Sequence, residues 1–279
     1  VTSNSGTADG TITRDGDLSV TALASTTALA TAIANAEAVH GIEQDIQAGT
    51  DCDASGNVAN SGSITLGVVA NALSTSGNAF STADAEVIDQ NVTTGNGNAE
   101  GTVTVTGNLT ANAMSLASAP NGNASAFADA DGVRQFVTSS GMGNADATAS
   151  NSETIDLVAQ ANASAQQQAQ ATTSRLQGIQ QFVTGNVGNA TGFIDNSGSI
   201  LANATALADS LESSAFATAR ASGIQQLVRV DDTGTATGTA INSSDSSVDI
   251  TVLASASANL FASAFANVQG IDQSVSIGV

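Results

Sequence analysis

The chain has 279 residues and a formal net charge of −20, and only 11% of its residues are charged and 3% aromatic. Five Arg and no Lys face 25 acidic residues, so the chain would repel nucleic-acid phosphates and anionic lipid headgroups. Ala, Ser, Thr, Asn and Gly fill most of the sequence, and such small side chains cannot build a core of large apolar residues. These values argue against a conventional globular enzyme and against a nucleic-acid partner.

Membrane insertion is not expected either. No stretch reaches the ~18 consecutive apolar residues that a transmembrane helix requires. The first residues, Val1–Asn4, lack the basic start and apolar run of a signal peptide, so we expect a soluble chain or a processed form without its leader. The single cysteine, Cys52, excludes an intrachain disulfide and a thiolate metal cluster.

The first predicted elements along the chain are strands. The aliphatic residue Leu18 follows the turn sequence Asp15-Gly16-Asp17, and Ala occupies every even position in residues 28–38. A period of two indicates a strand, whereas an amphipathic helix has a period of 3.6. The same alternation recurs in residues 215–221 and 262–266. We therefore predict strands that carry one face of small side chains.

The next element, Ile42–Ile46, has the pattern [Ile/Val]-x-Gln-x-[Val/Ile] and recurs through the chain. Its glutamines are Gln44, Gln90, Gln135, Gln181, Gln226 and Gln273. The aliphatic residues two places earlier are Ile42, Ile88, Val133, Ile179, Ile224 and Ile271. The position of Leu18 recurs as Ile64, Leu109, Ile155, Ile200 and Val248, and the next glutamine follows after 26 residues five times and after 25 once. Six units, at about 1–47, 48–92, 93–137, 138–183, 184–228 and 229–279, therefore share one register.

The period, the strands and the turns together predict an all-β fold, a parallel β-solenoid (β-helix) that forms one domain over residues 1–279. Turns are indicated by Gly and Asn, as in Gly107-Asn108. In the fifth unit we expect strands at 189–195, 199–208 and 214–228. The sequence leaves open whether each unit forms one wide coil or two coils of about 22 residues.

Equivalent residues of successive coils are expected to form columns, because parallel strands pair in register ~4.8 Å apart. Stacked glutamine amides would then bond to one another along the axis, which satisfies them when they are buried. The glutamine shares its parity with the aliphatic residue two places earlier, so we expect both to point inward. The alternative is that the glutamines point outward into solvent.

In the best example of the recurring motif, Gly and Asn follow the glutamine a few residues later: Gln181-Phe182-Val183-Thr184-Gly185-Asn186-Val187-Gly188-Asn189-Ala190. This arrangement resembles the Gln/Asn-ladder repeats of curlin-type fibre subunits. More broadly, the chain resembles the Ala/Asn/Gly-rich β-strand repeat proteins that bacteria secrete as surface filaments and adhesins. The resemblance extends over all six units and implies an extracellular fibre of bacterial origin.

The ends of the array favour self-association. A solenoid has unpaired strand edges at both ends, which soluble monomers usually cover with caps. The first unit carries the same landmarks as the others, and the sixth ends four residues after Val275, at Val279. We therefore expect head-to-tail addition of further copies, which gives an open filament. The alternative is a monomer whose termini fold over its ends, with residues 1–10 as a cap or as a strand donated to a neighbour.

The expected function is a structural subunit of a secreted surface fibre or biofilm matrix, with polysaccharide or another cell surface as a further partner. A second hypothesis is a monomeric solenoid that binds ice or polysaccharide, but Thr102-Val103-Thr104 is not reproduced across the six units. A third is a polysaccharide-processing enzyme, which would need clustered carboxylates and aromatic sugar platforms. Eight Phe and no Trp or Tyr argue against it.

Residues that carry chemistry are few. His40 is the only histidine, so we expect no catalytic residue and no cofactor. Acidic pairs at the coil corners are the candidate Ca²⁺ ligands: Asp15/Asp17, Asp51/Asp53, Asp129/Asp131 and Asp231/Asp232. They lack the glycine-rich nonapeptide of Ca²⁺-binding β-rolls and the spacing of an EF-hand, so solvated turns are the expected reading.

Overall fold

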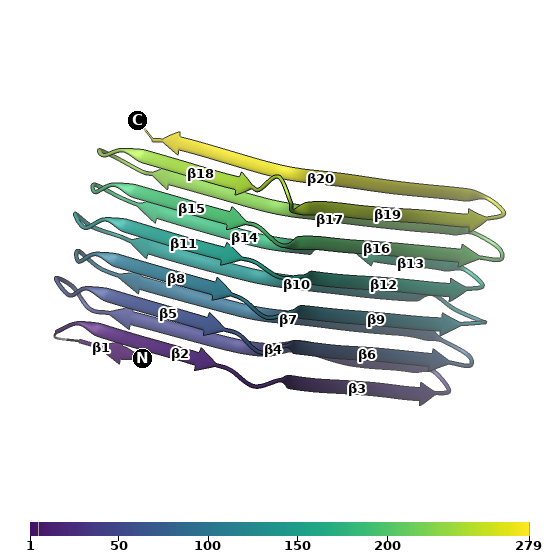
Figure 1. Cartoon of the computed structure of the whole chain (residues 1–279). Coiled ribbons are helices and arrows are strands. Elements are labelled where there is room, and N and C mark those ends of the chain that lie inside the picture. The colour runs from purple at the N-terminus through teal and green to yellow at the C-terminus, as the bar shows by residue number, and fades with distance from the viewer. Residues whose placement is uncertain (5, 279) are drawn as a thin grey trace.

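The structure, a computed structural model, describes residues 1–4 and 6–278, except for the side chains of residues 37–39. The side chains of Glu37 and Ala38, which end the predicted alternation over 28–38, and the terminal Val279 lie outside this description. The described residues form a stack of coils built from strands alone (Figure 1). No helix in this part of the chain is long and apolar enough to cross a membrane.

Each coil contributes one strand to each of three parallel sheets. The short-strand sheet contains β2 (Ala8–Arg14), β5 (Ala54–Asn60), β8 (Ala99–Val105), β11 (Ala145–Asn151), β15 (Ala190–Asn196) and β18 (Ala236–Asn242). The medium-strand sheet contains β3 (Leu18–Ala28), β6 (Ile64–Ser74), β9 (Leu109–Ala119), β12 (Ile155–Ala165), β16 (Ser199–Ser210) and β19 (Ser247–Ala258). The long-strand sheet contains β4 (Thr31–Ala48), β7 (Asn78–Thr94), β10 (Ala124–Ser139), β13 (Gln168–Thr173) with β14 (Leu176–Gly185), β17 (Ser214–Val230), β20 (Phe261–Ile277) and the short β1 (Thr2–Ser3).

This arrangement confirms the predicted parallel β-solenoid and shows that each unit forms one wide coil. The fifth coil consists of β15, β16 and β17, close to the three strands predicted there. Within a coil, the short and medium strands follow one another along one side, and the long strand returns along the other (Figure 1). The cross-section is therefore two layers thick.

Small side chains fill the space between the layers. Alternating Ala residues of the long strands, such as Ala83 and Ala85, pack with Ala70 and Ala72 of the medium strands, and all are fully buried. Larger aliphatic residues, including Ile64 and the others of its column, fill the bend between the short and medium strands. Close packing of many small groups replaces a core of bulky ones.

The constant spacing of 26 residues conceals a compensation in the fourth coil. The turn between Ala165 and Ala169 is one residue shorter than its counterpart between Ala119 and Ala124. The strand that follows has one residue more, because Ser174-Arg175 stands opposite a single residue of β10. This bulge divides the long strand into β13 and β14 and restores the register.

The sixth coil has the same short turn without a bulge. Ser210 pairs with Ala258 and Ala215 with Ala262, and the register of β17 and β20 then continues to Gln226 and Gln273. The spacing in this unit is therefore 25 residues and not 26, because the turn is one residue shorter and no bulge adds a residue to the following strand.

Candidate functional site

The structure places the six recurring glutamines in one column of the long-strand sheet, pointing inward. Each Nε2 donates to the Oε1 of the glutamine in the preceding coil, at 2.8 Å for the four junctions from Gln44–Gln90 to Gln181–Gln226 and 2.6 Å for Gln226–Gln273. The aliphatic columns that begin at Ile42 and Leu18 are also in register through all six coils. We call the glutamine column the Gln ladder.

The Gln ladder packs against a column of small residues in the short-strand sheet. These are Gly10, Gly56, Gly101, Ala147, Gly192 and Gly238. A Cβ on Gly101 would lie 2.9 Å from Gln90 Oε1 and 2.5 Å from a methyl group of Val137. The glycines of this column therefore leave room for the glutamine amides. The second amide hydrogen also finds an acceptor, as in the bond from Gln135 Nε2 to Thr148 O at 3.2 Å.

The Gln ladder has a direction, because every amide donates toward the N-terminal end. At that end, Gln44 Nε2 donates to the backbone oxygens of Gly10 and Asn57. At the other end, Gln273 Oε1 accepts no hydrogen bond within the described residues, because no seventh glutamine stands above it. The two ends of the column are thus complementary, a donor at one and an acceptor at the other.

The C-terminal end coil is open. Ile271 of β20 is 50% exposed, whereas Ile224, its neighbour in β17, is fully buried. The side chains of β20 are exposed along nearly its whole length, since no strand covers its outer edge in the described chain. A further coil in register would bury Ile271 and the apolar residues of the same face.

The N-terminal end coil is covered at one corner only. Thr2 and Ser3 of β1 pair with Gln47 and Ala48, and the backbone oxygen of Val1 accepts from the Gln47 N–H at 2.8 Å. The rest of β4 has no strand on its outer edge. Of the candidate cap, residues 1–10, residues 1–3 form a partial cap, whereas Ala8–Gly10 belong to β2 of the first coil.

A crease runs along the outer face of the long-strand sheet. At its centre two consecutive residues point inward, as Gly41 and Ile42 do in the first coil: a Cβ on Gly41 would contact the Ile64 side chain at 2.8 Å. The outward residues on either side of this pair are therefore three positions apart in the sequence, and their side chains contact each other, as His40 and Glu43 do. They form two columns, His40, Glu86, Asp131, Gln177, Ser222 and Gln269, and Glu43, Asp89, Arg134, Gln180, Gln225 and Asp272.

The crease gathers titratable groups in the first three coils. His40 Nε2 lies 3.1 Å from Glu86 Oε2, and Arg134 Nη1 lies 3.0 Å from Glu86 Oε1. Burial raises the pKa of Glu86, and the nearby Asp89 raises it further, whereas Arg134 and His40 oppose the rise. Burial likewise raises the pKa of Asp89. Ligand atoms of His40, Glu86 and Asp89 lie within 4.8 Å of one another, but Arg134 already supplies these carboxylates with a cation.

Two buried aspartates follow in the third coil. Asp129 Oδ1 accepts from the backbone N–H groups of Ser174 and Arg175 at 3.0 and 2.8 Å, which satisfies the donors freed by the bulge. Asp131 lies between Glu86 and Gln177 in the crease, and its Oδ1 has no hydrogen-bond partner. Burial raises the pKa of Asp131 to about 8, against the opposing effect of Arg175. This carboxyl group is therefore neutral at pH 7.

Five acidic residues of the predicted corner pairs have partners at the coil corners. Asp17 Oδ1 accepts from the Ser63 N–H at 2.9 Å, and Asp53 Oδ1 accepts from the Asn98 N–H at 2.7 Å, so each bonds to the next coil. Asp15, Asp51 and Asp231 bond to Ser61, Asn96 and Arg229. The corner assignment is wrong for Asp129 and Asp131, because both lie inside β10, where the strand crosses the crease.

Sequence reasoning missed the crease and both columns of glycine. A signal was present, since Gly41, Gly132, Gly178, Gly223 and Gly270 each immediately precede the aliphatic residue of the recurring motif. The small residue before the aliphatic one marks the point at which the period of two breaks. No family model, curated protein or solved structure matches the chain.

Proposed function

We propose that the chain is a structural subunit of an extracellular filament that assembles head-to-tail by stacking of its end coils. The observation that carries this proposal is the open C-terminal coil. Its strand β20 continues the columns of β17 in register, and its apolar residues remain exposed. Unpaired strand edges with matching side chains are templates for further strand addition. An end-to-end contact of unlike surfaces does not close on itself, so growth gives a filament.

The junction would repeat the contacts found inside the subunit. Gln44 Nε2 of an incoming copy would exchange its bond to Gly10 O for one to Gln273 Oε1, and would then donate as each later glutamine does to its predecessor. Ile42 would cover Ile271 in the same way that Ile271 covers Ile224. The glutamine column and this aliphatic column therefore find matching side chains on both surfaces.

Residues 1–3 would have to dissociate from β4 during assembly. They pair with β4 at Gln47 and Ala48, where Ser276 and Ile277 of the neighbouring copy would lie in a continuous stack. β1 pairs through only two residues, so its displacement costs little beside a complete long strand. The extracellular and bacterial setting of the filament rests on the resemblance to curlin-type repeats.

The ice- or polysaccharide-binding alternative has weaker support. One outward column of the short-strand sheet contains Thr11, Asn57, Thr102, Thr148, Phe193 and Thr239. Asn57 and Phe193 interrupt the threonines, so the face presents no uniform repeat to a crystalline or polymeric ligand.

The test uses a variant that affects the junction alone. Gly270→Ala adds a Cβ with nothing within 4 Å in the single chain, whereas a Cβ on Gly223 would lie 2.7 Å from the Gly270 carbonyl oxygen. In the filament the new methyl group would meet the Gly41 carbonyl of the next copy in the same way. We expect the variant to fold normally and to elongate more slowly than the parent, by electron microscopy and sedimentation.

Gly67→Ala is the matched control, because its Cβ would make only ordinary contacts with Thr21. It should elongate like the parent. Dispersed particles from the parent chain at all concentrations, or equal elongation by Gly270→Ala, would contradict the proposal.

A further inference from the structure

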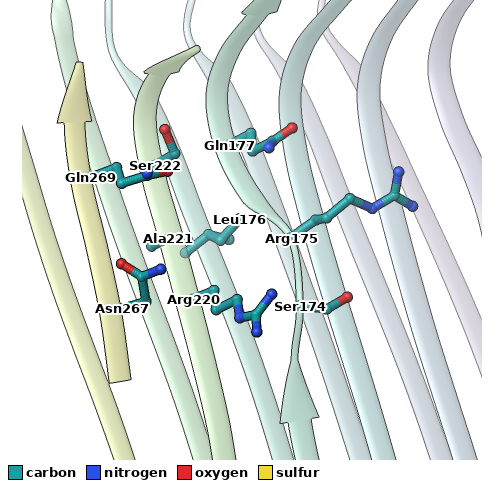
Figure 2. A pocket seen from close by; sticks show the side chains of 9 residues that line it. All are labelled: Ser174, Arg175, Leu176, Gln177, Arg220, Ala221, Ser222, Asn267 and Gln269. Carbon is teal, nitrogen blue, oxygen red and sulfur yellow. The ribbon is translucent and has the colours of Figure 1, made fainter. Parts of the chain in front are cut away.

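The bulge of the fourth coil opens a cavity of about 180 Å³ in the crease. Pairing between the fourth and fifth coils stops at Thr173–Ala219 and resumes at Gln177–Ser222. Figure 2 shows side chains from the fourth, fifth and sixth coils around this gap. Nine residues line it: Ser174, Arg175, Leu176, Gln177, Arg220, Ala221, Ser222, Asn267 and Gln269. We call this cavity the bulge notch.

Polar groups in the bulge notch have unused hydrogen-bonding capacity. Ser222 is only 5% exposed, and its Oγ has no hydrogen-bond partner. The Oε1 atom of Gln177 also has none, although its Nε2 donates to Gln225 Oε1 at 3.0 Å. A buried hydroxyl or amide without a partner destabilises the protein, so a ligand that supplies the missing bonds is favoured.

The charge of the bulge notch is opposite to that of the chain. The chain has 25 acidic residues, but none of them lines the cavity. Arg175 turns away toward the third coil, where its Nε lies 3.5 Å from Asp129 Oδ2 (Figure 2). Arg220 forms no ion pair within the described residues, and its guanidinium carbon lies 5.5 Å from the centre of the Phe265 ring. An anionic group would therefore find an uncompensated guanidinium.

We propose that the bulge notch binds one carboxylated sugar unit, such as a uronate residue of an acidic polysaccharide. Its carboxylate would pair with Arg220, which offers planar, charge-assisted hydrogen bonds. Its hydroxyls would donate to Gln177 Oε1 and bond with Ser222 Oγ, which can both donate and accept. The cavity is smaller than the ~300–1,000 Å³ of sites for drug-sized ligands, so a single ring is the largest unit that it holds.

The proposed ligand contacts come from the fourth and fifth coils and so do not require a filament, although Asn267 and Gln269 of the cavity wall belong to the end coil. In a filament each subunit would present one bulge notch at the same position around the axis. In a monomer the same site would serve alone.

The experiment titrates the 279-residue chain with sodium galacturonate, galactose and inorganic phosphate, followed by NMR chemical shifts and calorimetry. We expect galacturonate to bind at least tenfold more tightly than galactose, with shifts centred on Arg220 and Ser222. Arg220→Gln should lower the affinity for galacturonate to that of galactose. Ser222→Ala should weaken binding of both sugars severalfold.

Arg229→Gln is the matched control, since Arg229 pairs with Asp231 and does not line the cavity. It should bind like the parent, and unchanged melting curves would show that each variant folds. Equal affinity of parent and Arg220→Gln for galacturonate would overturn the proposal. Phosphate binding as tight as galacturonate binding would also overturn it, because the sugar ring would then contribute nothing.

Discussion

Asp131 is a buried side chain whose protonation affects the stability of the fold. It is 3% exposed, and its Oδ1 has no hydrogen-bond partner. Burial raises its pKa from the ordinary aspartate value of 3.8 to about 8, so the folded state holds a proton that the unfolded state releases. Its contribution is therefore fully present below about pH 4 and is lost progressively as the pH rises to about 8.

Asp131→Asn should remove this dependence. The amide is neutral at all these pH values, and its Nδ2 can donate to the unpartnered Oε1 of Gln177. We expect the variant to be more stable than the parent at pH 8, on the order of 2–5 kcal/mol, and nearly equal at pH 4. Chemical denaturation at both values measures the difference. A loss of stability at pH 8 would mean that the ionised carboxylate is well paired.

The residues of the Gln ladder were more predictable than those of the crease. The inward direction of Gln135 follows from its shared parity with Val133, and the structure buries both side chains. The position of Glu86 beside His40 and Arg134 could not be obtained in this way. It depends on two consecutive inward residues, Val87 and Ile88, at which the simple alternation fails.

At the scale of elements, the long strand carries the main irregularities. Each long strand bends at the crease, where the inward residue before the aliphatic one is Gly in five coils and Val87 in the second. Val87 is fully buried, so the second coil accommodates a side chain at a position where the other coils have none. Turn length and strand length compensate in the fourth coil, which the total spacing of 26 residues could not reveal.

Gly178→Ala tests the close approach of strands at the bend. The new Cβ would lie 2.5 Å from the Gly223 carbonyl oxygen and 2.5 Å from Ile200 Cγ2, so the backbone of β17 would have to move. Overpacking of this kind costs about 1–3 kcal/mol, and we expect a matching loss in thermal or urea denaturation. The single-chain stability of Gly270→Ala should remain unchanged, because its Cβ has no neighbour. Equal stabilities of the two variants would show that the strands separate freely at this point.

At the scale of the whole molecule, the net charge of −20 opposes the association of copies. At the proposed junction, one pair of acidic side chains would add a local repulsion. Asp272 ends the column that begins with Glu43, so a head-to-tail stack would bring these two carboxylates together. Like charges in adjacent positions repel, and salt screens the repulsion.

Asp272→Asn should therefore elongate faster than the parent at neutral pH and low salt, and the difference should diminish in high salt. Asp249→Asn removes the same charge from the same end coil, but its column begins with Ser19. Turbidity and electron microscopy of both variants compare the rates. Equal acceleration by both would indicate an effect of net charge, and acceleration by neither would place the junction elsewhere.

The most direct test of head-to-tail stacking is the axial repeat of assemblies formed by the purified chain, measured by fibre diffraction or cryo-electron microscopy. Continuous stacking predicts a strong meridional reflection near ~4.8 Å and a subunit repeat of about 29 Å, from six coils at this spacing. Assemblies with strands parallel to the fibre axis, or with a subunit repeat unrelated to six coils, would contradict the account.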